Sequence, residues 1–233
     1  MTDSDGPQLI SDGPAFETAG LVHRVLRPDA PGPHPTVIML HGRSGDENAM
    51  WIFARAIPKN WLILSPRGIK PDLRRGYAWH PRERDEWPAL DKFDGAVEAL
   101  NQFIKALPSL YDADLERLYL MGFSQGAATS YAMAMRHPGL IKGLAGLVGF
   151  VPVGCDAAIE MAVLKNLPIF MAVGKEDVFI AHARAQNCAK TLKAAGAELS
   201  YHEYETGHRL NAAGVKDLKA WWQNQEQIAE TIR

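Results

Sequence analysis

Apolar runs of strand length alternate with segments of helical periodicity along most of the chain. The strand patterns occupy residues 36–42, 61–68, 115–124, 141–150, 167–177 and 197–205. The helical patterns occupy residues 46–57, 91–107, 125–139, 157–165, 180–196 and 214–232. This alternation indicates a mostly parallel central sheet with helices on both faces. We therefore predict a single α/β domain over residues 20–233, preceded by an N-terminal segment over residues 1–19.

Prolines mark two boundaries within this pattern. In the helical pattern 91–107 the apolar residues recur at spacings of three and four, and Pro108 is expected to end that helix. Four prolines fall within residues 27–35, which we interpret as a linking turn. The preceding stretch, residues 21–28, alternates apolar and polar positions, which favours an edge or antiparallel strand.

Composition narrows the class of protein. The chain has 233 residues, of which 47% are hydrophobic and 22% charged, so a core of normal size is available. The net charge of −2 does not indicate a nucleic-acid or anionic-membrane partner. The N-terminus lacks the pattern of a signal peptide and no apolar run approaches the length of a membrane span. We expect a soluble cytoplasmic protein without stable membrane insertion.

The two cysteines, Cys155 and Cys188, do not have the spacing of a metal-binding pair. We expect both to be free thiols, with Cys188 a small semi-buried residue of a helix. No other metal-ligand cluster is visible, so neither a metal nor a cofactor is predicted.

The strand pattern 115–124 runs into Gly122-Phe123-Ser124-Gln125-Gly126, and a helical pattern follows at once. A chain that reverses this sharply needs a strained backbone at the serine, and glycines two residues before and after relieve the crowding. This is the G-x-S-x-G nucleophile elbow, which exposes a serine hydroxyl at the edge of a sheet. Because strand and helix flank the motif in the required order, we interpret Ser124 as a nucleophile.

A serine hydroxyl needs a base, and the base needs an acid to orient it. In this arrangement the chain order is serine, acid, histidine. Asp177 follows directly after a strand pattern, with the neighbouring Glu176 as the alternative acid. Among the downstream histidines, His208 alone lies in a loop past a strand, so it is the predicted base.

A tetrahedral intermediate also needs donors for its oxyanion. The backbone N–H of Gln125 is one candidate, because it begins the helix after the elbow. The loop after the strand 36–42 supplies the second candidate, the backbone N–H of Arg43. His41 precedes Gly42 at the strand end and is interpreted as a brace for this loop rather than as a second base.

These stretches together resemble the phospholipase/carboxylesterase branch of the α/β-hydrolases, which includes the acyl-protein thioesterases. The matching stretches are LHGRSGDEN, SPRG, GYAWHP, MGFSQGA, GFVP, AVGKED and TGHRL, in the family's order over about residues 20–225. The resemblance implies a Ser124–His208–Asp177 triad, no cofactor and a mostly open site. It also implies that Trp79 and Phe150 border the substrate groove.

Departures from the family pattern bear on the substrate. Eukaryotic thioesterases of the family usually carry leucine where this chain has Arg43. This favours small esters over lipidated proteins, so we expect a serine esterase acting on short to medium acyl esters, with thioesters left open. Acyl-protein thioesterase or lysophospholipase activity, a dienelactone-hydrolase-like enzyme and a non-catalytic binding protein remain as alternatives, and homodimer formation is open.

The loop over residues 66–88 is rich in both arginine and acidic residues. Arg67, Arg74, Arg75, Arg82 and Arg84 alternate with carboxylates along it. We interpret this loop as a solvated surface of mixed charge, with an anion-reading role as the alternative.

Overall fold

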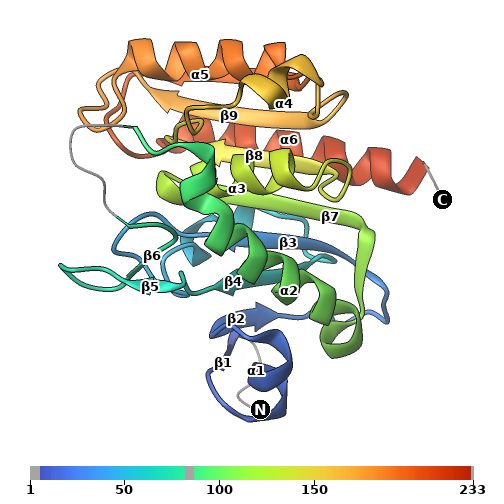
Figure 1. The fold of residues 1–233 in the computed structure, drawn as a ribbon. Helices are drawn as coiled ribbons and strands as arrows, with labels where there is room; N and C mark the ends of the chain where they lie inside the picture. Colours follow the sequence, from blue (N-terminus) through green and yellow to red (C-terminus); the bar gives the residue numbers. More distant parts are fainter. Residues whose placement is uncertain (1–5, 82–86, 232–233) are drawn as a thin grey trace.

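A computed structural model describes residues 6–81 and 87–231, and its centre is an eight-stranded sheet (Figure 1). In chain order its strands are β1 (Gln8–Ile10), β2 (His23–Leu26), β3 (His34–Leu40), β4 (Leu62–Pro66), β7 (Ala113–Phe123), β8 (Gly143–Leu147), β9 (Pro168–Gly174) and β10 (Glu198–Tyr204). Their spatial order is β1-β2-β4-β3-β7-β8-β9-β10. The pairs β1–β2 and β2–β4 are antiparallel and all other pairs of neighbours are parallel. The predicted α/β class is confirmed.

The remaining elements connect these strands. The helices are α1 (Gly13–Ala19), α2 (Asp94–Tyr111), α3 (Gln125–Arg136), α4 (Asp156–Glu160), α5 (His182–Ala194) and α6 (Ala212–Thr231). Two short 3-10 helices, η1 (Trp51–Ala56) and η2 (Leu90–Phe93), and a small hairpin of β5 (Lys70–Pro71) and β6 (Tyr77–Ala78) complete the chain.

Alternate residues of the central strands enter two separate cores. In β7, Leu118 and Leu120 pack into one core, whereas Tyr119 and Met121 pack into the other. Helices α1 to α5 contribute to the first core, and α6 and η1 contribute to the second. Figure 1 shows α2 and α3 in front of the sheet and α6 behind it. Both faces of the sheet are therefore covered, which explains why the strands are apolar throughout rather than alternating.

The start of the chain adds an edge to the sheet. Residues 21–28 were expected to form an edge or antiparallel strand, and β2 is antiparallel to β4. No strand or helix is predicted for residues 1–19, yet β1 pairs with β2 and Ala19 at the end of α1 is buried in the first core. A three-residue strand carries too short a pattern to be recognised from sequence.

The expected end of the helix at Pro108 is wrong. Helix α2 continues to Tyr111 and ends where Asp112 adopts a left-handed conformation and donates its N–H to the carbonyl of Pro108. A proline costs a helix one backbone hydrogen bond. Here Leu107 and Tyr111 are buried in the core on either side of it, and this burial favours continuing the turn.

The expected helix over residues 46–57 is only partly present. Residues 47–50 form turns, and the helical part is the 3-10 segment η1. The side chain of Asp46 accepts a hydrogen bond from the backbone N–H of Asn48 at 2.9 Å, and the indole of Trp51 donates to the carbonyl of Glu47 at 2.8 Å. These local bonds compete with helical pairing and stabilise a turn instead.

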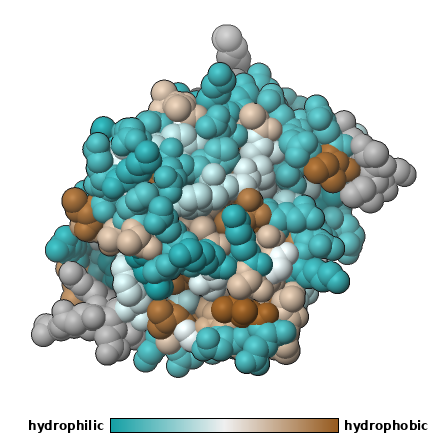
Figure 2. Space-filling model, turned by 90° about the horizontal axis from the view of Figure 1, so that it is seen from above, coloured by the Kyte–Doolittle hydropathy of each residue, from teal (hydrophilic) through white to brown (hydrophobic). Residues whose placement is uncertain are grey.

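The face of the molecule that α5 covers is mainly polar. Figure 2 looks down on the side that α5 covers and shows a largely hydrophilic surface with separate hydrophobic spots. None of the helices within residues 6–81 and 87–231 has the length and apolar character needed to cross a membrane.

Candidate active site

A cavity of about 550 Å³ opens at the edge where the parallel strands end. Parallel neighbours bring their carboxyl ends to the same edge, so the loops after β3, β7, β9 and β10 meet there. The residues predicted from sequence that line this cavity are Ser124, Gln125, His208, Arg43 and Phe150. Asp177 lies behind His208, and Trp79 lies behind the cavity wall.

Ser124 stands on a sharp turn between β7 and α3. Its backbone has φ 53° and ψ −114°, a sparsely populated conformation for a residue with a side chain. The turn is held because the N–H of Ser124 donates to the carbonyl of Leu147 at 2.9 Å. The side chain is half-buried and faces the cavity.

The two glycines of the motif are required by close backbone contacts. A Cβ atom on Gly126 would lie 2.0 Å from the carbonyl oxygen of Leu40, and one on Gly122 would lie 2.3 Å from the backbone of Gly126. No side chain fits at such distances. Helix α3 therefore starts directly against the end of β3 and β7, which brings its N-terminal N–H groups to the cavity.

Asp177 and His208 form a hydrogen-bonded pair. The His208 Nδ1 to Asp177 Oδ2 distance is 2.7 Å. The other carboxylate oxygen accepts the backbone N–H groups of Phe179 and Ile180 at 2.8 and 3.0 Å. Asp177 is 6% exposed, whereas Glu176 is an exposed surface residue. A carboxylate accepts, so Nδ1 carries the proton and Nε2 of His208 is left for another partner.

The pair forms because the loops after β9 and β10 touch through their backbones. A Cβ on Gly174 would lie 2.3 Å from the carbonyl oxygen of Gly207 and 2.4 Å from that of Thr206. The N–H of Glu176 also donates to the carbonyl of Thr206 at 3.1 Å. The glycine at the end of β9 thus allows the loop after β9 to pack directly against the backbone of the loop after β10.

Aromatic rings fix the plane of the imidazole. The ring of His208 packs edge-to-face against Phe123 and Phe179, with centroid separations of 5.3 and 5.1 Å. Phe179 was not predicted from sequence as a site residue, although it follows Asp177 by only two positions. The remaining downstream histidines, His137, His182 and His202, do not line the cavity.

The loop after β3 lies directly against the serine. A Cβ on Gly42 would lie 3.3 Å from Cβ of Ser124. The next residue is Arg43, whose backbone is therefore next to the turn that carries Ser124. Gln125 is the first residue of α3, so its N–H has no partner within the helix. Two backbone donors thus flank the serine, and the N-terminus of α3 adds positive potential.

His41 braces this loop, as expected. Its Nδ1 donates to the carbonyl of Gly42 at 2.7 Å, and its Nε2 accepts the N–H of Gly68 at 2.8 Å. Both ring nitrogens are hydrogen-bonded, one as a donor and one as an acceptor, which fixes the neutral tautomer with its proton on Nδ1. Burial lowers the pKa of His41 from the ordinary value of 6.5, since a charged ring would lose its hydration.

The assignment of Trp79 to the substrate groove is wrong. Trp79 is fully buried and does not line the cavity. Its backbone N–H donates to the Gln125 side chain at 2.8 Å, and its indole N–H donates to the carbonyl of His41 at 2.9 Å. The indole N–H has a buried acceptor, so Trp79 supports the loop after β3 from the side away from the cavity and does not contact substrate.

Phe150 does line the cavity, where it packs against Trp87 with a centroid separation of 5.0 Å. Trp87 was not predicted as a site residue, because nothing in its local sequence distinguishes it from a surface aromatic. Arg184 covers the outer face of Trp87, with its guanidinium carbon 4.9 Å from the ring centroid. The wall of the cavity is therefore aromatic on this side.

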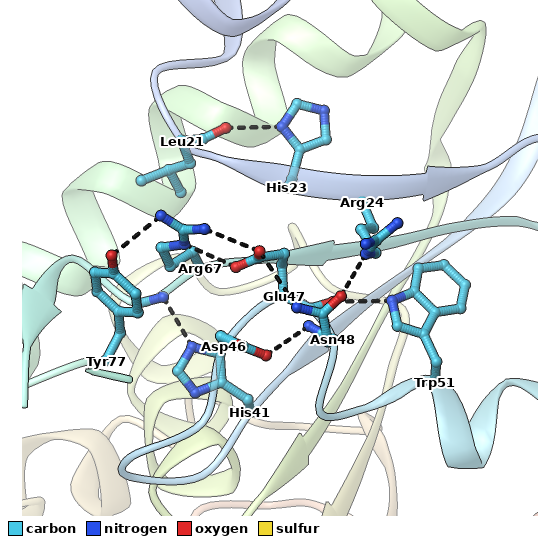
Figure 3. A network of polar contacts seen from close by, with 11 residues as sticks. Leu21, His23, Arg24, His41, Asp46, Glu47, Asn48, Trp51, Arg67 and Tyr77 are labelled. Atoms are coloured by element: carbon cyan, nitrogen blue, oxygen red, sulfur yellow. Dashed lines mark hydrogen bonds and ion pairs between the residues drawn. The ribbon is translucent and has the colours of Figure 1, made fainter. Parts of the chain in front are cut away.

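A part-buried ion pair joins the loop after β3 to the segment after β4 (Figure 3). The guanidinium of Arg67 donates to both carboxylate oxygens of Glu47, at 2.7 and 2.9 Å, and to the hydroxyl of Tyr77 at 3.1 Å. The hydrogen bond from Arg67 lowers the pKa of Glu47. Arg67 is thus a partly exposed member of an ion pair, whereas Arg74 and Arg75 are exposed as expected for a solvated loop. Arg82 and Arg84 lie outside the described residues.

Among the described residues no group of three or more histidine, cysteine, aspartate or glutamate side chains has a geometry suited to a metal ion. Cys155 and Cys188 are free and buried. The described site brings together a serine hydroxyl, an imidazole that is hydrogen-bonded to a buried carboxylate, and the N-terminal N–H groups of α3, which are the groups that nucleophilic attack by a serine oxygen requires.

The family model for phospholipases and carboxylesterases matches residues 23–225. Among curated proteins, the putative hydrolase MhqD of Bacillus subtilis is 23% identical over 188 residues, which cover 80% of this chain and 91% of that protein. Acyl-protein thioesterase 1 of Schizosaccharomyces pombe is 26% identical over 172 residues, which cover 67% of this chain and 75% of that protein.

Solved structures share the fold at lower identity. A carboxylesterase from Mesorhizobium loti superimposes with a TM-score of 0.78 at 19% identity, covering 93% of this chain and 98% of that one. The Bacillus cereus carboxylesterase gives the same TM-score at 21% identity, covering 90% of this chain and 97% of the other. At these identities the superpositions establish the α/β-hydrolase architecture.

Proposed function

The chain belongs to the phospholipase/carboxylesterase family of hydrolases, and from this premise we propose that it is a serine esterase with Ser124, His208 and Asp177 as its catalytic triad. The observation that carries the proposal is the His208–Asp177 hydrogen bond of 2.7 Å beside a cavity that Ser124 also lines. Its substrate is a small-molecule carboxylic ester of a short to medium acyl chain.

Acylation begins when Nε2 of His208 takes the proton from the hydroxyl of Ser124, whose oxygen attacks the ester carbonyl. The carbonyl oxygen becomes an oxyanion, held by the backbone N–H groups of Gln125 and Arg43. Asp177 accepts a hydrogen bond from the Nδ1–H of His208 throughout, which keeps the required tautomer and stabilises the imidazolium. The imidazolium then protonates the leaving alcohol.

Deacylation repeats these steps with water. His208 removes a proton from a water molecule, which attacks the acyl-enzyme carbonyl. As the tetrahedral intermediate collapses, the imidazolium returns the proton to the Ser124 oxygen, and the acid and free Ser124 are released. The same two backbone donors hold the second oxyanion. The tight turn at Ser124 and the adjacent loop at Gly42 allow the same two N–H groups to hold both oxyanions, because these groups need not move between acylation and deacylation.

The aromatic wall supports a preference for short and medium chains. Phe150, Trp87 and Phe179 all line the cavity near His208. A series of p-nitrophenyl esters from acetate to palmitate tests the preference, and we expect kcat/KM to peak well before palmitate. A steady rise to palmitate would instead favour a lipid-handling thioesterase or lysophospholipase. The dienelactone-hydrolase-like alternative usually carries a cysteine nucleophile, whereas this chain has Ser124.

Substitution of the proposed nucleophile tests the function itself. Ser124→Ala should lower kcat for p-nitrophenyl butyrate by roughly 10⁴-fold or more, since triad residues act as a unit. The circular dichroism spectrum and melting temperature serve as the folding control. Turnover within tenfold of the native enzyme in a folded variant would contradict the assignment and would favour a different nucleophile or a non-catalytic role for this site.

A further inference from the structure

The β5–β6 hairpin forms one wall of the cavity because it is tied to the oxyanion loop. The N–H of Ser44 donates to the carbonyl of Tyr77 at 2.9 Å, and the N–H of Tyr77 donates to the carbonyl of Gly45 at 2.7 Å. The hydroxyl of Ser44 also donates to the carboxylate of Asp72. Two residues at the tip of the hairpin, Leu73 and Arg74, consequently line the cavity that contains Ser124.

Three charged side chains line the described part of the cavity: Arg43, Asp72 and Arg74. The carboxylate of Asp72 is already occupied, because it accepts the hydroxyl of Ser44, accepts the N–H of Leu73 at 2.9 Å and lies 3.8 Å from the guanidinium of Arg43. The Ser44 hydrogen bond lowers the pKa of Asp72, so this carboxylate is charged at neutral pH. Among the residues that the structure describes, two cations thus face one anion at this cavity, an excess of one positive charge.

The two arginines differ in how they are held. The guanidinium of Arg43 donates to the carbonyl oxygens of His80 and Pro81 at 3.5 and 3.3 Å, so it is a fixed part of the wall. Within the described residues Arg74 makes no hydrogen bond or ion pair, and it is exposed. A guanidinium offers several donors in a planar fork that matches a carboxylate. Arg74 is therefore the group that has donors to offer a ligand.

Apolar side chains form the rest of the cavity beside these cations. Leu73, Trp87, Phe150 and Phe179 line it together with Ser124. A ligand that fits both parts has an apolar body and one negative charge. A single excess positive charge matches a carboxylate better than a phosphate group, which carries about −1.5 to −2 at neutral pH.

We propose that the enzyme acts on esters that also carry a free carboxylate, such as half-esters of dicarboxylic acids, and that Arg74 binds this carboxylate. The proposal rests on the esterase function above and narrows its substrate class. The ester carbonyl sits at Ser124, the apolar part of the substrate packs on the aromatic wall, and the carboxylate reaches the tip of the hairpin. Arg43 adds positive potential from the side of the oxyanion loop.

Two matched pairs of esters test the proposal on the full-length enzyme. Monoethyl adipate and ethyl 6-methylheptanoate differ by a carboxylate against an isopropyl group on the acyl side. The butyryl ester of 4-hydroxybutanoate and 4-methylpentyl butyrate make the same comparison on the alcohol side. For at least one pair we expect kcat/KM to favour the charged ester by about tenfold, a ratio that corresponds to one charge-assisted hydrogen-bonded contact.

Arg74→Gln should then lower this charged-to-neutral ratio by about three- to tenfold, while Arg74→Lys retains part of it. Arg75→Gln is the matched control, since Arg75 is an equally exposed neighbour on the same hairpin that does not line the cavity. The control should leave the ratio unchanged. Added sodium chloride should reduce the ratio of the native enzyme, because salt screens a contact at the cavity mouth.

The outcomes separate this proposal from the esterase function. The carboxylate site would be overturned, and the esterase function left intact, by either of two results. One is hydrolysis of the neutral esters with no preference for the charged ester in either pair. The other is an equal loss of that preference in Arg74→Gln and Arg75→Gln. A lack of hydrolysis of all four esters and of p-nitrophenyl butyrate would overturn the esterase function instead. A preference that survives Arg74→Gln would assign the recognition to other residues and would also overturn the proposal.

Discussion

The two sides of the cavity are built by different means. On the acid–base side, where the proposed acid and base lie, the loops after β9 and β10 are in contact through backbone atoms at Gly174 and Gly207, and this contact brings Asp177 to His208. On the oxyanion side, where the proposed oxyanion donors lie, the loop after β3 is held by polar side chains, among them the part-buried pair Glu47 and Arg67.

The difference has a consequence for substitutions. Backbone contacts survive the replacement of most side chains, so changes on the acid–base side should affect the reaction only where they remove a reacting group. A polar side-chain network leaves buried groups unsatisfied when one member is removed. Changes on the oxyanion side should therefore affect catalysis and stability together.

The sharpest contrast on the acid–base side is between two adjacent carboxylates. Asp177→Asn should lower kcat by roughly 10³–10⁴-fold, because an amide in place of the carboxylate favours the wrong tautomer of His208. Glu176→Gln, one residue away and exposed, should have almost no effect. Steady-state kinetics with p-nitrophenyl butyrate measure both. A large loss in Glu176→Gln with a small one in Asp177→Asn would reverse the assignment of the acid.

On the oxyanion side, Glu47→Gln should reduce both activity and stability. The variant loses the charge that pairs with Arg67, where the Glu47 side chain is 5% and the Arg67 side chain 28% exposed, at a cost of about 1–3 kcal/mol in the free energy of unfolding. The loop that carries Arg43 is then less well held, and we expect kcat/KM to fall by about tenfold. Urea unfolding and steady-state kinetics measure the two effects.

Glu116→Gln is the matched control for that variant. Glu116 also pairs with a cation, Lys142 at 3.1 Å, but its side chain is 87% exposed. Exposed pairs contribute at most about 1 kcal/mol. If Glu47→Gln changed neither quantity more than this control does, the polar network would not hold the loop and the contrast between the two sides would fail.

A smaller effect is expected from pH. Burial lowers the pKa of both His23 and His41 from the ordinary value of 6.5. As the pH falls below about 6.5, the unfolded chain binds protons at these positions that the folded chain does not bind. The free energy of unfolding should therefore decrease with falling pH through this window.

Urea unfolding at a series of pH values from 8 to 5 measures this decrease. The variants His23→Gln and His41→Gln should each show a shallower dependence than the native protein. His41 supports the loop after β3, whereas the ring of His23 bonds to Leu21 and Tyr111 and does not line the cavity. Of these two histidines only His41 should therefore affect the pH dependence of kcat/KM, and equal effects of the two variants on that dependence would argue against a loop-bracing role.

The same contrast explains which residues of the site can be predicted from the sequence and which cannot. Ser124, Asp177 and His208 each follow a strand, and a parallel sheet brings strand ends together, so local patterns suffice to select them. The pairing of Glu47 with Arg67 depends on how two loops pack, and neither residue has a local signal. Trp79 was assigned to the groove because its segment resembles the family's groove segment, and such a resemblance does not reveal which way the ring faces.

The measurement that tests the central claim most directly is the site of covalent modification by a fluorophosphonate, located by peptide mass analysis. We predict one adduct per chain, on the peptide that contains Ser124. The adduct should be absent in Ser124→Ala and should form far more slowly in Asp177→Asn, because His208 then loses the carboxylate that accepts its Nδ1–H and fixes its tautomer. Ester hydrolysis without any adduct at Ser124, or an adduct on another residue that abolishes activity, would contradict the account.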